Sequence, residues 1–171
     1  MTNQISRDQF IEFAEENLTI AKGLLQRDGA LDPILFIFNS DWQLQIVQMI
    51  TETVDVLMHM IVRAAVTKFE ARAFLFLGET WISEVVMKPG ENIPESRIRP
   101  SDDPNHYEGI VCAGAHPDYR ISWITKFIRN DDGTLVFEKT IRMEERGSGF
   151  RDYGGFTRIP LAGMIDDIQQ N

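Results

Sequence analysis

The side chains with the clearest capacity for chemistry lie close together in the middle of the sequence, after the apolar run Ala71 to Leu77. Carboxylates and imidazole bind divalent cations and also serve as general acids and bases. The pattern predicts a site beside a buried strand, which in an enzyme would support metal-assisted or acid–base hydrolysis. In chain order the candidate residues are Glu79, Trp81, Asp102, Asp103, His106 and Glu108.

The same acidic residues are also typical of a solvated loop. Ser101 to Pro104 is turn-forming, because aspartate side chains bond nearby backbone groups. The spacing matches no metal signature such as H-E-x-x-H. The alternative interpretation is therefore a turn without chemistry, and the metal-binding capacity of the segment stays open.

Two other histidines, His116 and His59, are candidates for functional groups. Cys112 lies four residues before His116, and a cysteine nucleophile needs a nearby base. On a strand that spacing separates the side chains by about 13 Å, so a small buried residue is the alternative for Cys112. His59 has Asp55 one helical turn before it, which is enough to pair with it.

A glycine-rich segment from Gly147 to Phe156 contains Arg151 and Tyr153. Its glycines do not have the spacing of a nucleotide-binding loop. Tyrosine and arginine are favoured anchors in protein interfaces. We therefore expect either a loop without partners or a partner-binding loop that uses Arg151 and Tyr153.

No linear motif identifies a reaction. The chain has no G-x-S-x-G elbow, no P-loop and no second cysteine for zinc. We expect no cofactor. Because acid–base sites assembled in space leave no linear trace, whether the protein is an enzyme stays open.

Composition excludes some classes of partner. The 171 residues fit one domain, 1–171, and the net charge is −9. An acidic surface disfavours nucleic acid and anionic membranes, which bind mainly through lysine and arginine. Met1 to Ile5 lack the features of a signal peptide, and no apolar run approaches membrane-spanning length. We expect a cytoplasmic protein.

Periodicity predicts the elements that position these residues. Ser6 and Gln9 form a capping-box pattern before a helix that ends near Gly29. Apolar spacing predicts a second helix, Thr51 to Glu70. Strands are expected in the following ranges: Pro33 to Phe38, Trp42 to Met49 with Trp42, Leu44 and Ile46 on a buried face, Ala71 to Val86, Glu108 to Ala115, Tyr119 to Arg129, and Thr134 to Met143.

These elements predict an α+β fold with a largely antiparallel sheet of five or six strands and two main helices on one face. The connection through the second helix suggests one parallel strand pair, formed with the strand that begins at Ala71. A long loop, Met87 to Tyr107, contains four prolines and connects two central strands.

Three patches resemble a loose group of uncharacterised small proteins of bacteria and their phages. The patches are Asp28-Gly29-x-Leu31-x-Pro33, Gly78-Glu79-x-Trp81, and Arg99 to Pro104 followed by Glu108. The chain departs from that group at Asn105 to Tyr107, where the group tends to carry a charged residue. The resemblance implies a compact α+β module and carries no activity.

The leading hypothesis is a binding or structural module that forms homo-oligomers, because a meander of strands leaves edges that need covering. Another protein is a second possible partner. The alternative is the hydrolase-like enzyme described above, which uses the region of Glu79, Asp102, His106 and Glu108.

Overall fold

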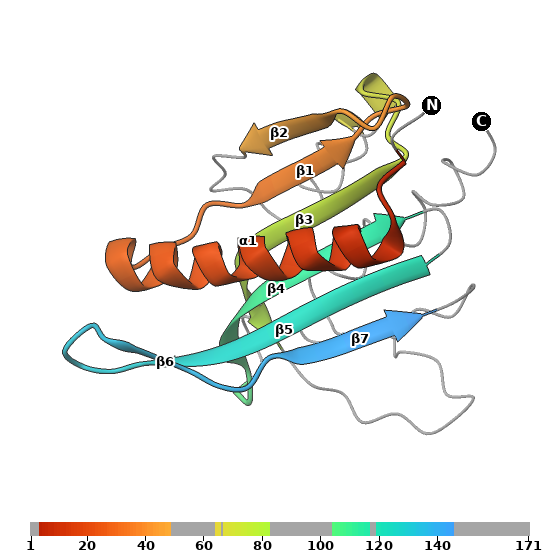
Figure 1. The fold of residues 1–171 in the computed structure, drawn as a ribbon. Coiled ribbons are helices and arrows are strands. Elements are labelled where there is room, and N and C mark those ends of the chain that lie inside the picture. The colour runs from red at the N-terminus through yellow and green to blue at the C-terminus, as the bar shows by residue number, and fades with distance from the viewer. Residues whose placement is uncertain (1–3, 49–63, 66, 83–103, 117–118, 146–171) are drawn as a thin grey trace.

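The computed structural model describes residues 4–48, 64–65, 67–82, 104–116 and 119–145 of the chain (Figure 1). In these ranges one long helix, α1 (Arg7–Asp28), accompanies a sheet of seven strands. The strands are β1 (Ile34–Phe38), β2 (Leu44–Gln48), β3 (Ala73–Ile82), β4 (Tyr107–His116), β5 (Tyr119–Arg129), β6 (Leu135–Phe137) and β7 (Ile141–Glu145).

The strand order is β2-β1-β3-β4-β5-β6, and β7 also pairs with β5. Every pair is antiparallel. The predicted parallel pair is therefore wrong. β2 and β3 run in the same direction but β1 lies between them, so neither can pair with the other.

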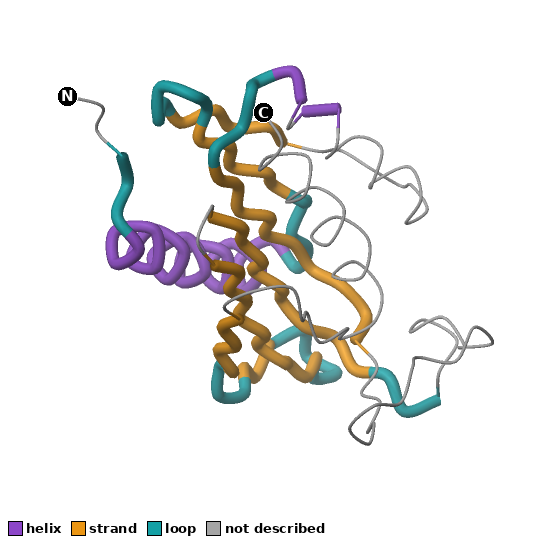
Figure 2. Tube along the Cα trace, turned by 90° about the vertical axis from the view of Figure 1, so that its right-hand side faces the viewer, coloured by secondary structure: helices purple, strands orange, loops and turns teal. Residues whose placement is uncertain are grey.

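The structure confirms helix α1, which was predicted from the capping box at its start and the glycine at its end. The Ser6 hydroxyl accepts from the Gln9 backbone while the Gln9 side chain accepts from the Ser6 backbone, which satisfies two N–H groups at the helix start. Gly29 ends the helix at φ 75°, a conformation that glycine adopts without a steric penalty. Helix α1 lies along one face of the sheet (Figure 2). Its apolar stripe packs into the buried cluster on that face.

The predicted fold class, with two main helices on one face, is wrong. In the part of the chain that the structure describes, one long helix, α1, packs on one face of a seven-stranded sheet. Most of the predicted second helix lies outside the described residues, and of its end Ala64, Ala65, Thr67 and Lys68 are helical. The predicted last strand is divided into β6 and β7, which raises the strand number.

Two apolar layers lie on opposite faces of the sheet. On the α1 face, Phe10 is fully buried and its ring lies above Gly114 of β4. A Cβ atom at Gly114 would lie 2.8 Å from the Phe10 ring, so the absence of a side chain there allows the helix to approach. The opposite face is also buried, with Leu35, Ile37 and Phe74 at its centre.

One expected burial is wrong. The alternation in Trp42 to Met49 predicted a buried face formed by Trp42, Leu44 and Ile46, yet Leu44 and Ile46 are exposed. The two side chains lie on the α1 face, opposite Phe38 and Phe36. The helix covers β1 through Phe13 and leaves the edge strand β2 outside its footprint.

Candidate functional site

Four of the predicted site residues lie together at one end of the sheet. Trp81 of β3 is paired with Glu108 of β4, and Glu79 lies two residues before Trp81 on the same face. His106 immediately precedes β4. Its ring meets the Trp81 ring edge-on, with 4.4 Å between the two ring centroids. The other four, Asp102, Asp103, Arg151 and Tyr153, lie outside the described residues.

The central residue of this cluster is Arg129, which the sequence analysis did not single out. Its Nη2 donates to Glu79 at 2.6 Å and its Nε donates to Glu108 at 3.1 Å. Arg129 ends β5 on the same face, where Phe127 precedes it toward the helix. The available signal was the alternation of Trp123, Phe127 and Arg129 along one strand face.

The cluster also connects the sheet to the end of α1. The Arg129 Nη1 donates to the backbone oxygen of Gly29 at 2.8 Å. The backbone N–H of Leu31 donates to Glu79 at 3.2 Å. Residues from β3, β4, β5 and the segment after α1 thus meet at one guanidinium, and we name Glu79, Glu108 and Arg129 the Arg129 cluster.

The electrostatics of the Arg129 cluster favour a structural role. Burial lowers the pKa of Arg129, but hydrogen bonds to Glu108 and Glu79 outweigh it, and the net pKa is raised. Both carboxylates are bound to a permanent cation, the guanidinium of Arg129. Among the described residues, no three His, Cys, Asp or Glu side chains are grouped to hold a metal ion.

A second polar cluster connects the start of α1 to β7. Arg7 donates to both carboxylate oxygens of Glu144, and Arg142 lies 3.6 Å from the same carboxylate. Glu15 accepts from the Trp123 indole at 3.2 Å and from Arg142 at 3.4 Å. Apart from the Arg142–Glu144 pair, these contacts join residues more than a hundred positions apart, so local sequence patterns could not predict them.

An open groove of ≈ 580 Å³ lies along this second cluster, outside the predicted site region. The groove is lined by Arg7, Asp8, Ile11, Glu12, Glu15, Glu16, Thr19 and Arg142. Its acidic side chains lie on the solvent side of α1, and its arginines are bound to Glu144 and Glu15. The groove is therefore a water-exposed surface of mixed character between α1 and β7.

We predict that Glu144 makes the free energy of unfolding depend on pH. Hydrogen bonding to Arg7 is the main reason that the pKa of Glu144 lies below its ordinary value of 4.5. A lowered folded-state pKa stabilises the protein above the unfolded value, and that stabilisation disappears as pH falls below 4.5. Urea titrations should show that Glu144→Gln is less stable than wild type at pH 7. The gap should narrow below pH 4.5, and a gap independent of pH would contradict the prediction.

Cys112 and His116 do not form a nucleophile–base pair. Both lie on the α1 face of β4, where the Cys112 Sγ faces the Ala14 oxygen at 4.0 Å. Burial raises the pKa of the Cys112 thiol, which disfavours the reactive thiolate. The His116 Nε2 lies 3.3 Å from the backbone oxygen of Ile5. The His116 ring stacks on the Tyr119 ring, with 4.7 Å between the ring centroids. His59 lies outside the described residues.

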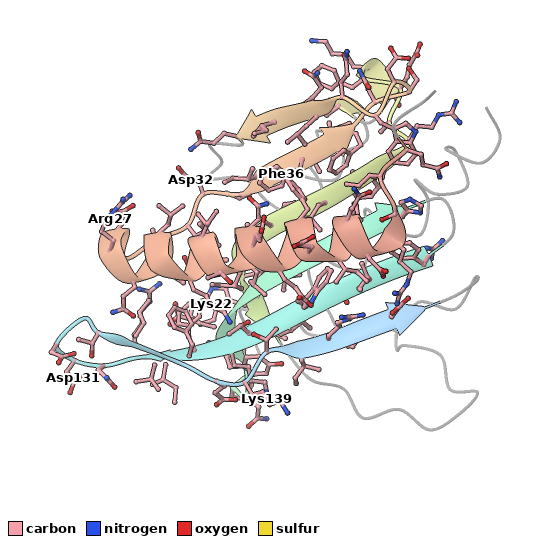
Figure 3. The ribbon with its side chains drawn as sticks, viewed as in Figure 1. Lys22, Arg27, Asp32, Phe36, Asp131 and Lys139 are labelled. Carbon is pink, nitrogen blue, oxygen red and sulfur yellow. The ribbon has the colours of Figure 1, made fainter. Side chains whose placement is uncertain are left out.

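A chain of hydrogen bonds joins α1 to the far edge of the sheet. The Lys22 amine donates to Thr140 at 2.8 Å, and the Thr140 and fully buried Thr125 hydroxyls lie 2.7 Å apart. Lys22 points from α1 toward the edge formed by β6 and β7 (Figure 3). Burial lowers the pKa of Lys22. The contact fixes the helix over β5.

The two edges of the sheet differ in how they are protected. β6 and β7 form one interrupted edge, because three residue steps on β5, Ile124 to Phe127, face four on the edge, Phe137 to Ile141. This extra residue is a β-bulge, which twists an edge away from further pairing. Charged side chains accompany it, including Glu138 and Lys139.

β2, at the opposite edge, has none of these devices. Its five residues, Leu44 to Gln48, include no charge and no proline. In the part of the chain that the structure describes, no strand pairs with its outer side. Leu44 and Ile46 are exposed there. Such an edge is a template for an additional strand.

The backbone of β2 shows which groups are available. The Asn39 N–H donates to the Gln43 oxygen, so these two form a hydrogen-bonded position of the β1–β2 ladder. Hydrogen-bonded and open positions alternate in antiparallel pairs. The peptide groups of Gln45 and Val47 therefore face β1, whereas those of Leu44 and Ile46 face outward.

No helix in the described ranges is long and apolar enough to cross a membrane. The chain matches no protein-family model, no curated protein and no solved structure.

Proposed function

We propose that this protein is a self-associating binding module with a structural role, and that β2 is its contact surface. The observation that carries the proposal is the β2 edge, which within the described ranges is paired only with β1 and exposes Leu44 and Ile46. Main-chain groups of an added strand supply affinity in this mode of recognition, and alternate side chains supply specificity. The net charge of −9 argues against nucleic acid as the partner.

The hydrolase-like alternative is less well supported. Glu79 and Glu108 are bound by Arg129, which leaves neither carboxylate unopposed for acid–base work. The remaining acidic candidates, Asp102 and Asp103, lie outside the described residues. A thermal shift with Zn²⁺, Mn²⁺ and Mg²⁺ tests this alternative, since a metal that binds the native state raises the melting midpoint.

We predict that Ile46→Lys disrupts self-association. The purified protein should scatter light as a dimer or larger species at tens of micromolar. A lysine at the exposed edge should raise the dissociation constant about tenfold or more, because an added strand would have to desolvate the ammonium group.

Ile20→Lys is the matched control for this experiment. Ile20 lies on α1 and is 58% exposed, close to the 62% of Ile46, so the chemical change is the same at another surface. The control should associate like wild type. A wild-type protein that stays monomeric at tens of micromolar would falsify the proposed function.

A further inference from the structure

We infer that the strand which completes the β2 edge is β2 of a second copy, placed antiparallel about a twofold axis through Gln45. The inference rests on the proposed function and specifies its geometry. The product is a closed dimer with one continuous sheet. Each step below follows from the register of β1 and β2 and from the chemistry of the two sheet edges.

The first step concerns which edge of a second molecule could meet β2. Pairing β2 with the β6–β7 edge would leave one free edge on each copy and would propagate into an open filament. The bulge between Phe137 and Ile141 opposes that arrangement, because it interrupts the ladder that an added strand needs. β2 paired with β2 uses the same surface on both copies and closes.

Charge permits this approach of two identical acidic chains. Like charges placed opposite each other in a strand pair are destabilising. From Trp42 to Gln48 there is no charged side chain, so the two strands meet without direct repulsion despite the overall charge of −9. The edge at β7 carries the charged side chains Arg142, Glu144 and Glu145, a known protection of an edge strand against further pairing.

The second step concerns register. The outward peptide groups belong to Leu44 and Ile46, so these residues must form the hydrogen-bonded positions between copies. A twofold axis at Gln45 places each Leu44 opposite the Ile46 of the other copy and forms about four main-chain hydrogen bonds. An axis at Ile46 would instead place Leu44 opposite Gln48. Aliphatic cross-strand pairs favour the axis at Gln45.

The third step concerns the faces of the dimer. A twofold axis between antiparallel strands stands perpendicular to the sheet, so both α1 helices lie on the same side. Leu44 and Ile46 lie on that side as well, opposite Phe38 and Phe36. The four aliphatic side chains then form one apolar strip between the two helices. This arrangement covers the side chains that α1 leaves exposed within one copy.

Cysteine cross-linking tests the register directly. In the proposed dimer, Gln45 faces Gln45 at an open position, where Cα atoms lie about 4.5 Å apart, within disulfide range. Two Ile46 residues would be offset along the strands, with Cα atoms about 8 Å apart and outside that range. The natural Cys112 is fully buried and does not compete for oxidation.

We expect Gln45→Cys to form a disulfide-linked dimer on mild oxidation on the order of tenfold faster than Ile46→Cys, because pairing raises the effective thiol concentration. Non-reducing electrophoresis measures this, and circular dichroism verifies the fold of both variants. Faster linking of Ile46→Cys would overturn the register at Gln45. No linking of either variant, in a protein that light scattering shows to be dimeric, would overturn the inference and leave self-association intact. A monomer by light scattering would instead remove the proposed function itself.

Discussion

Phe10→Ala is expected to lower the free energy of unfolding by about 3–5 kcal/mol, the range for truncating a fully buried phenylalanine. Phe10 is 0% exposed and occupies the contact between α1 and the sheet. Its ring lies 5.9 Å from Phe38, 6.0 Å from His116 and 6.1 Å from Tyr119. Removing the ring leaves a cavity where three strands and the helix meet. Urea denaturation at pH 7 measures the loss.

Gly114 supplies the control for this prediction. In the wild-type background, Gly114→Ala should destabilise the protein, because the new Cβ would lie 2.8 Å from the Phe10 ring and 3.0 Å from Leu75. In the Phe10→Ala background the clash with the ring is absent, and most of that cost should disappear. Equal costs in both backgrounds would show that Phe10 does not occupy the space above Gly114.

The parts of the fold that the sequence predicted are those specified by local chemistry. The start of α1 follows from Ser6 and Gln9, and its end from Gly29. The turn between β5 and β6 follows from Asn130 to Gly133, with Gly133 at φ 82°. These signals act within a few residues, so they can be recognised in the sequence without knowing which distant residues pack against them.

The incorrect predictions concern features that depend on contacts between residues far apart in the sequence. Alternation in β2 correctly indicated a strand, but exposure of Leu44 and Ile46 depends on how far α1 extends across the sheet. Likewise, only the register of β5 against its edge reveals that one extra residue divides β6 from β7. The parallel pair failed because β1, an earlier strand, occupies the position between β2 and β3.

For the same reason, the sequence predicted only part of the candidate site. Glu79, Trp81 and Glu108 were expected in one region because they gather beside an expected buried strand, and the pairing of β3 with β4 brings them together. Arg129 comes from a third strand, and its relation to the two glutamates depends on the β4–β5 register. Without the arginine, two adjacent carboxylates suggest acid–base chemistry. With it, the same carboxylates form an ion-pair network that holds the end of α1 to the sheet.

That reinterpretation leads to the second large expected effect. Arg129→Met retains the aliphatic stem and removes the guanidinium that contacts Glu79, Glu108 and the Gly29 oxygen. Two partly buried carboxylates would then lie near each other without a counter-charge. We expect a loss of about 1–3 kcal/mol, below the cost of breaking a fully buried pair because these side chains keep some contact with water.

Arg27→Met is the matched control for Arg129→Met. Arg27 lies 2.6 Å from Asp28, the same distance as Arg129 from Glu79, but its side chain is 70% exposed against 33% for Arg129. A surface pair of this kind contributes little because water screens it, so the control should cost much less stability than Arg129→Met. The comparison separates burial from ion-pair distance as the source of the effect.

Glu79→Gln distinguishes a structural cluster from a catalytic one. In the wild-type background the substitution weakens the pair with Arg129 and should destabilise the protein. In the Arg129→Met background it removes one of two unopposed charges and should restore part of the lost stability, a reversal of sign that only coupled residues give. Functional sites often retain groups at the expense of stability. If Arg129→Met proved as stable as wild type, or more stable, the glutamates would not need the arginine for folding, and the acid–base hypothesis would recover its two carboxylates.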